Sequence, residues 1–105
     1  MTLSPFTLQV IEIVKGIPRG KVMTYGLVAE QAGNRRAARQ VVHILHTQSR
    51  KHNLPWHRIV NARGEIALKD ELARAEQTAL LREEGIEVDE QGTINLVKYL
   101  HEPEI

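Results

Sequence analysis

The chain has 105 residues, a formal net charge of +1 and no cysteine, so disulfides and thiolate metal sites are excluded and a reducing, cytoplasmic setting is expected. This length is typical of one domain with one modest core, and we expect a single domain over residues 1–105. The sequence has neither a signal-peptide pattern nor an apolar run near the roughly 20 residues that span a bilayer, so secretion and membrane insertion are not expected.

The first predicted element is a helix that begins near the start of the chain. Ser4 followed by Pro5 is typical of an N-cap and a first helical residue, because the hydroxyl can accept a backbone hydrogen bond and proline fits the first turn. Apolar residues then recur at helical spacing: Phe6, Val10, Ile13, Val14 and Ile17. The pattern predicts an amphipathic helix that ends at Pro18-Arg19-Gly20.

Two further helices are predicted in a helix-turn-helix arrangement. Thr24 can cap a short helix that Gly33 ends, and Asn34 then forms a turn. A third helix is predicted from about residue 35 to residue 49, with Ala38, Val41, Val42 and Leu45 on its apolar face. Its opposite face is polar and carries Arg36, Arg39, His43 and His46.

A small β wing is predicted after this helix. The apolar pair Ile59-Val60 and the segment Ile66 to Leu68 flank Asn61-Ala62-Arg63-Gly64, whose composition is typical of a hairpin turn. The wing and the three helices together predict a fold that is mainly α with a small β wing, a winged helix-turn-helix.

The last third of the chain predicts one more helix and an irregular tail. Asp70 can cap a helix that runs through Leu81, and Gly85 is a natural stop. Beyond it, apolar residues at positions 86, 88, 94 and 96 alternate weakly, and the pattern is compatible with strand or loop.

The charges are spread unevenly along the chain. Nearly all lysines and arginines lie between Lys15 and Lys69, where only Glu30 and Glu65 oppose them, whereas residues 70–104 are dominated by carboxylates. The basic part is suited to a phosphate backbone, and an ordinary solvated surface is the alternative that charge alone leaves open.

Three separated segments carry a family resemblance. Thr24-Tyr25-Gly26, Ala37-Ala38-Arg39-Gln40-Val41 and Pro55-Trp56-His57-Arg58-Ile59-Val60 resemble, in order and spacing, the DNA-binding domain of the O6-alkylguanine-DNA alkyltransferases. Trp56 stands where those enzymes have the nucleophilic cysteine, which makes the chain most similar to the alkyltransferase-like proteins. An indole cannot accept an alkyl group as a thiolate does, so the resemblance implies a protein that is not an enzyme.

The resemblance implies a role for each matching residue in binding damaged DNA. Tyr25 would crowd the phosphate beside the lesion, and Arg39 would fill the gap left by the rotated base. Trp56 would line a lesion pocket together with Tyr25, Pro55, Ile59 and Lys69. Taken alone, Tyr25 and Trp56 are also compatible with core packing, and Arg39 with an ordinary surface or phosphate contact.

Further residues are assigned around that site. Arg36, Ala37 and His43 would join Tyr25 and Arg39 in the DNA-binding surface. His57 and Glu84 match residues that help to generate the thiolate in the enzymes, and without a thiol we interpret them as a structural remnant. Arg58 is expected to brace local backbone or a carboxylate. No cofactor or metal is predicted, because the pair His43 and His46 has no evident third ligand.

The resemblance therefore implies a DNA-damage sensor that binds O6-alkylguanine through the minor groove, flips the base into the pocket and flags it for nucleotide excision repair, shielding it from alkyltransferase. Duplex DNA with the lesion and excision-repair damage-recognition proteins are the expected partners of a monomer. One alternative is a winged-helix transcription regulator that binds undamaged DNA. Another is a base-flipping glycosylase or hydrolase with His57 or Glu84 as general base.

Overall fold

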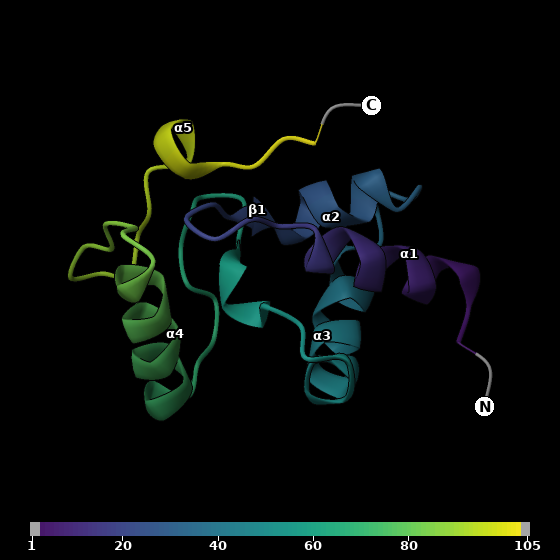
Figure 1. Ribbon diagram of the computed structural model, residues 1–105, viewed down its shortest axis with the longest axis horizontal. Helices are drawn as coiled ribbons and strands as arrows, with labels where there is room; N and C mark the ends of the chain where they lie inside the picture. The colour runs from purple at the N-terminus through teal and green to yellow at the C-terminus, as the bar shows by residue number, and fades with distance from the viewer. Residues whose placement is uncertain (1–2, 104–105) are drawn as a thin grey trace.

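The computed structural model describes residues 3–103, and its elements follow the predicted order. The helices are α1 (Pro5–Lys15), α2 (Tyr25–Gln31), α3 (Ala38–His52), α4 (Glu71–Glu83) and α5 (Leu96–Tyr99). Two short strands, β1 (Met23–Thr24) and β2 (Ile59–Val60), and one 3-10 turn, η1 (Trp56–Arg58), complete the set. The prediction of a mainly helical fold with a small β component is confirmed. Figure 1 shows α1, α2 and α3 together on one side and α4 on the other.

The predicted N-caps are all present. In each one, a side-chain oxygen accepts a hydrogen bond from a backbone amide in the first turn, which satisfies a donor that the helix leaves unpaired. The three caps are Ser4 with Thr7 at 3.1 Å, Thr24 with Leu27 at 3.0 Å and Asp70 with Ala73 at 2.9 Å. Gly85 also ends α4 as predicted, with a φ of 84° directly after the C-cap.

Helix α3 begins and ends later than its sequence pattern indicates. The side-chain oxygen of Asn34 accepts from the amide of Arg36 at 3.1 Å, which holds residues 35–37 in a turn before the helix starts at Ala38. At the other end, Asn53 adopts the left-handed conformation with a φ of 51° and terminates the helix after His52. The helix therefore continues for three residues beyond the predicted end at Ser49.

The two strands pair in parallel, which corrects the predicted hairpin. Met23 pairs with Ile59 and Thr24 with Val60, so β2 joins a segment far back in the chain rather than residues 66–68. The turn itself is present, because the amide of Gly64 donates to the carbonyl oxygen of Asn61 at 2.9 Å. Gly64 has a φ of 80°, and a Cβ there would collide with the carbonyl oxygen of Ile94.

A side chain of α4 replaces the missing strand partner of residues 66–68. The guanidinium of Arg74 donates to the carbonyl oxygens of Ile66 at 2.7 Å and Leu68 at 2.9 Å. The amide of Ile66 donates to the carbonyl oxygen of Gly92 at 2.9 Å. Because these backbone groups are satisfied in other ways, the segment runs extended beside α4 without forming a hairpin ladder.

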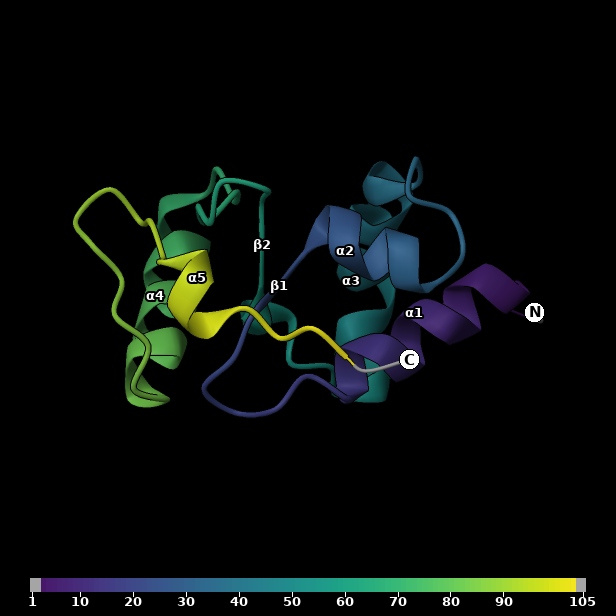
Figure 2. The ribbon, with the colours of Figure 1, turned by 90° about the horizontal axis from the view of Figure 1, so that it is seen from above.

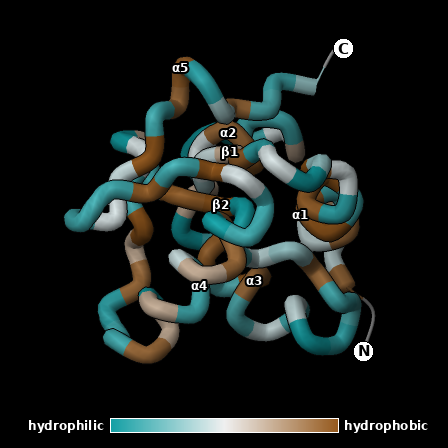
Figure 3. The backbone as a smooth tube through the Cα atoms, turned by 60° about the vertical axis from the view of Figure 1, so that its left-hand side comes forward, coloured by the Kyte–Doolittle hydropathy of each residue, from teal (hydrophilic) through white to brown (hydrophobic). Residues whose placement is uncertain are grey.

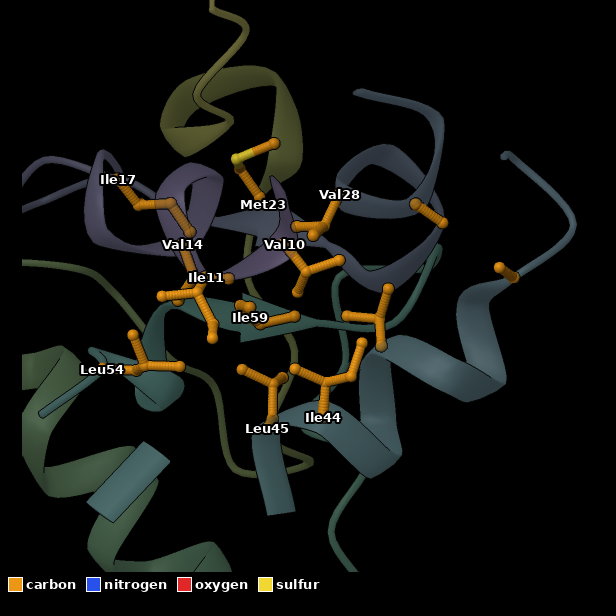
Figure 4. Packing of buried hydrophobic residues seen from close by; sticks show 13 residues of the cluster. Val10, Ile11, Val14, Ile17, Met23, Val28, Ile44, Leu45, Leu54 and Ile59 are labelled. Carbon is orange, nitrogen blue, oxygen red and sulfur yellow. The ribbon is translucent and has the colours of Figure 1, made fainter. Parts of the chain in front are cut away.

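Two hydrophobic clusters meet at the short sheet. Neighbouring residues of a strand point to opposite faces. Accordingly Met23 and Ile59 lie in the cluster formed by α1, α2 and α3, whereas Val22 and Val60 lie in a second cluster with residues of α4 and the C-terminal segment. Figure 4 shows Met23 and Ile59 among the first cluster, and Figure 3 shows β2 as a hydrophobic segment near the middle of the molecule. The sheet thus joins the two halves of the core.

The C-terminal segment is more ordered than the prediction of strand or loop. Residues 96–99 form α5, so the interpretation of Leu96 as strand or loop is wrong, and the cause is a local cap: the side chain of Asn95 accepts from the amide of Val97 at 3.0 Å. Isolated bridges tie Val22 to Leu100 and Glu65 to Thr93. Figure 2 shows α4 and α5 across the sheet from α1, α2 and α3.

Within residues 3–103, no helix is long and apolar enough to cross a membrane.

Candidate nucleic-acid interface and pocket

Helix α3 presents a basic face along its whole length. Arg39, His43, His46 and Arg50 follow one another at spacings of four, three and four residues, which places them on one side of the helix, and all four are exposed. We call these four residues the basic stripe. Since α3 contains no aspartate or glutamate, nothing on the helix itself neutralises the stripe, and it suits contact with phosphates.

The turn before α3 separates two residues that the resemblance assigned together. Arg36 is exposed and available to a phosphate. Ala37, by contrast, is buried with 6% exposure and packs in the first hydrophobic cluster. The structure therefore does not place the side chain of Ala37 on the DNA-binding surface, because Ala37, the residue directly before α3, faces inward.

A pocket of about 480 Å³ opens beside the C-terminal half of α3. Its volume lies in the range of about 300 to 1,000 Å³ that is typical of small-molecule sites. The walls come from α2, α3, η1, the extended segment after the turn at 61–64, and α4. The lining residues are Tyr25, Val42, Leu45, His46, Ser49, Arg50, Asn53, Leu54, Trp56, Leu68, Ala73 and Gln77.

Two of the five residues predicted for the pocket line it. Tyr25 and Trp56 are part of its wall, although they are far apart in the sequence. Pro55 is half-buried outside the lining, and Lys69 is exposed outside it, next to Leu68, which does line it. Ile59 is fully buried in the core, because the inward face of β2 carries it away from the pocket. The structure thus corrects the predicted position of Ile59.

Trp56 is held at the start of η1 with its indole half-buried. Its amide donates to the carbonyl oxygen of Leu54 at 2.8 Å. The ring contacts the first hydrophobic cluster and stands edge-on to the imidazole of His57, with the ring centroids 6.1 Å apart and an angle of 87° between the planes. The indole therefore packs against the core on one side and forms a wall of the pocket on the other.

Tyr25 is the first residue of α2 and is positioned by the Thr24 cap. Its ring is half-buried against the first cluster and lines the pocket. Burial raises the pKa of the Tyr25 phenol, so the hydroxyl stays protonated and can donate a hydrogen bond near neutral pH.

Behind the pocket, Glu84 joins several segments of the chain. Its carboxylate lies 2.6 Å from Nε2 of His57 and 2.8 Å from Nη2 of Arg58, and it accepts from the amide of Gly20 at 2.8 Å. Arg58 also donates to the carbonyl oxygen of Ile17 at 2.9 Å. The expected contact of Arg58 with backbone and a carboxylate is present, and it ties α4 and η1 to the loop after α1.

This arrangement makes Glu84 a fixed anion rather than a proton acceptor. Its side chain is 4% exposed. Burial alone would raise the pKa of the carboxyl group, but the hydrogen bonds from Arg58, His57 and Gly20 outweigh it and lower the pKa from its ordinary 4.5 to about 2. Neither His57 nor Glu84 lines the pocket. Their geometry supports a structural role and gives no support to general-base chemistry on a bound nucleotide.

The lowered pKa of Glu84 predicts acid sensitivity of the fold. Because the folded-state pKa lies below the ordinary value, the ionised carboxylate stabilises the protein above about pH 4.5. We expect this contribution to be lost as the pH falls from about 4.5 to about 2. Urea unfolding across that range should show it, and the Glu84→Gln variant should have a shallower acid slope. An equal slope in both proteins would contradict this prediction.

Gln77 links α4 to the backbone of the Trp56 turn. It is 1% exposed, and its Nε2 donates to the carbonyl oxygens of His57 and Ile59, both at 3.0 Å. Two carbonyl partners fix the orientation of the side-chain amide, because only the nitrogen can donate to them. Sequence reasoning missed this residue, since its position in an amphipathic helix gives no sign of contacts with η1 and β2.

The part of the chain that the structure describes brings together no group of three or more histidines, aspartates or glutamates that could hold a metal ion. His43 and His46 lie on exposed positions of the basic stripe. Both imidazoles are accessible on the same side of α3 as Arg39 and Arg50.

The fold and the site define a helix-turn-helix domain with a basic α3 and an aromatic-walled pocket beside it. The family described as 6-O-methylguanine DNA methyltransferase, DNA binding domain, matches residues 5–86. The chain belongs to this family, among its alkyltransferase-like members.

Two relatives and one solved structure illustrate the relationship. A DNA base-flipping protein of Vibrio parahaemolyticus is 41% identical over 96% of this chain and 100% of its own length. Alkyltransferase-like protein 1 of Schizosaccharomyces pombe is 35% identical over 98% of this chain and 100% of its own length. A crystal structure of S. pombe Atl1 in complex with damaged DNA containing O6-carboxymethylguanine has a TM-score of 0.86 at 34% identity, with 98% and 100% coverage.

Proposed function

We propose that this protein is a non-enzymatic DNA-damage sensor that binds O6-alkylguanine in duplex DNA through the minor groove and flips the base into the pocket beside Trp56. The observation that carries the proposal is the placement of Trp56 in the wall of a pocket of about 480 Å³. The basic stripe of α3 runs to the same pocket. One relative is named a DNA base-flipping protein, and another was crystallised with damaged DNA, which supports the proposal.

The energetics favour a damaged base over an intact one. Rotating a base out of the stack costs a few kcal/mol, and less for a base that pairs poorly, as an O6-alkylated guanine does. Stacking on an aromatic wall returns about 1 to 3 kcal/mol per base. Because the two terms are of similar size, a modest difference in flipping cost is enough to make binding selective for the lesion.

Chemical repair is not part of the proposal, because the chain has no cysteine to accept an alkyl group. Glu84 and His57, which match the residues that help to activate the thiol in the enzymes, are hydrogen-bonded to each other, and Glu84 also pairs with Arg58, but the chain offers them no thiol. After incubation with the protein, an oligonucleotide carrying O6-methylguanine should be recovered with its adduct and glycosidic bond intact. Recovery of guanine or of an abasic site would contradict a sensor role.

Several side chains on and around α3 would contact the DNA. Arg39, at the N-terminal end of α3, would enter the stack in place of the flipped base, and Tyr25 would crowd the neighbouring phosphate. Arg36 and His43 would contact phosphates, and Lys69 would approach from the rim. All of these side chains except Tyr25 are exposed, which leaves them free to reach the duplex.

Replacement of Arg39 separates lesion recognition from backbone contact. We expect Arg39→Ala to weaken binding to a lesion duplex by roughly tenfold and binding to the undamaged duplex by much less, because an inserted side chain acts only when the base is flipped. Dissociation constants at one fixed salt concentration measure both effects. A loss of equal size on the two duplexes would show that Arg39 contacts only the backbone.

A lesion that is bound and not repaired needs a second pathway. We propose that the monomeric protein marks the site for nucleotide excision repair and shields it from alkyltransferase. Added to a reconstituted bacterial excision reaction, it should raise incision at O6-alkylguanine, and it should slow alkyl removal by an active alkyltransferase. No change in either rate would argue against this part of the proposal.

The direct test of lesion binding compares two short duplexes that differ only in one O6-methyl group. We expect a clearly lower Kd for the methylated duplex at near-physiological salt. Equal affinity would favour the alternative of a winged-helix regulator that binds undamaged DNA, and a selection for preferred sequences would then identify its operator.

A further inference from the structure

Among the described residues, the pocket is lined by basic side chains and by no acidic ones. Within the region that the structure describes, the lining contains Arg50, His46 and Tyr25 but no aspartate or glutamate, although the chain has 13 acidic residues. Arg50 and His46 lie one turn apart on α3 and line the same wall. The pocket therefore has a positive wall where α3 ends.

The guanidinium of Arg50 forms no ion pair with another side chain among residues 3–103. The ion pairs among residues 3–103 join Glu84 to His57 and Arg58, and Glu87 to Lys98. No carboxylate in this range pairs with Arg50, and its guanidinium makes no hydrogen bond there. An arginine fork presents donors that match a carboxylate well. This guanidinium is therefore available to a bound molecule.

The residue before it adds a second donor to the same wall. Ser49 lines the pocket, and its Oγ is buried with no hydrogen-bond partner among the described residues. Buried hydroxyl groups nearly always have a partner, and this one has none among those residues, so it remains able to donate to an atom bound at the pocket wall. A hydroxyl can donate to an anion. Arg50 and Ser49 thus provide adjacent donors.

Resting on the proposed function, we infer that this pocket selects O6 adducts that end in a negatively charged group, and that Arg50 is the residue that selects them. The carboxylate of such an adduct accepts hydrogen bonds from the Arg50 guanidinium and the Ser49 hydroxyl, while the base stacks beside Trp56. O6-carboxymethylguanine is a simple lesion of this class. Methyl and other neutral adducts bind without these contacts.

The test uses two lesions of the same shape and different charge. One duplex carries O6-carboxymethylguanine, and the other carries the corresponding neutral amide, O6-carbamoylmethylguanine. Because Arg50 is exposed, its ion pair is partly screened by solvent, and we expect the acid to bind about threefold to tenfold more tightly than the amide. In Arg50→Gln the ratio should fall to about one, whereas the ratio of the Kd values for O6-methylguanine and guanine should be kept, because loss of a charge of the basic stripe weakens both of those duplexes alike.

Lys51→Gln is the matched control, since it removes a neighbouring charge of α3 that does not line the pocket. It should keep the acid preference. Equal binding of acid and amide by the unaltered protein, or a preference that survives Arg50→Gln, would overturn the inference. Folding of each variant is checked by its Tm. A protein that still prefers O6-methylguanine over guanine but ignores the charge would refute only this inference, whereas loss of both preferences would refute the proposed function.

Discussion

Glu84→Gln is expected to destabilise the fold strongly for a substitution that keeps the size of the side chain. The substitution leaves Arg58, whose side chain is only 16% exposed, without its carboxylate, and breaking a buried ion pair in this way costs about 3 kcal/mol or more. For a domain of this size, such a loss lowers Tm by on the order of 10 °C. Thermal and urea unfolding at neutral pH would measure it.

The neighbouring residue provides the control for this prediction. Glu83 is exposed, and its side chain makes no hydrogen bond or ion pair within residues 3–103. Glu83→Gln should therefore shift the free energy of unfolding by no more than about 0.5 kcal/mol. If both variants unfolded at the same temperature, the network around Glu84 would not be a structural element of the fold.

Trp56→Ala is expected to give the largest loss of lesion binding. The indole forms a wall of the pocket, and removal of an aromatic stacking partner costs about 1 to 3 kcal/mol per base, which corresponds to roughly a fivefold to hundredfold rise in Kd. Binding to undamaged duplex should change much less, because that complex holds its bases in the stack. Titration of both duplexes with the variant measures the difference.

Trp56→Phe separates stacking from packing. Phenylalanine keeps an aromatic face and most of the contact with the first hydrophobic cluster, so it should retain more lesion affinity than alanine. Tm must be measured for both variants. A large fall in Tm together with an equal loss of binding to both duplexes would show that Trp56 acts as a core residue rather than as a pocket wall.

Local sequence signals predicted where most helices begin. They could not predict contacts between residues that are far apart in the sequence. Ser4, Thr24 and Asp70 act through hydrogen bonds within their own first turns, so their caps are visible in the sequence. The pairing of Ile59 with Met23 joins residues that no local pattern connects. The prediction of a hairpin assumed the nearest partner, whereas Arg74 takes the carbonyl groups of the supposed second strand.

The candidate site was also predicted only in part from the sequence. The motifs predicted Tyr25 and Trp56 in the pocket, and the structure brings both to its wall. Arg50 was missed because the third helix was predicted to end at Ser49. The cause lies in Asn53, whose left-handed conformation ends α3 later, and an asparagine at this point is a signal that could have extended the prediction.

An alkylated base is expected to enter the pocket beside Trp56 and to leave it unchanged. Since this is the only tryptophan of the chain and it lines the pocket, its fluorescence comes from one defined position at the site. Titration with a duplex containing O6-methylguanine should quench or shift the emission at lower concentrations than the undamaged duplex, and the adduct should be intact afterwards. Identical fluorescence titrations for the two duplexes, or removal of the methyl group, would contradict entry of the alkylated base into the pocket without repair.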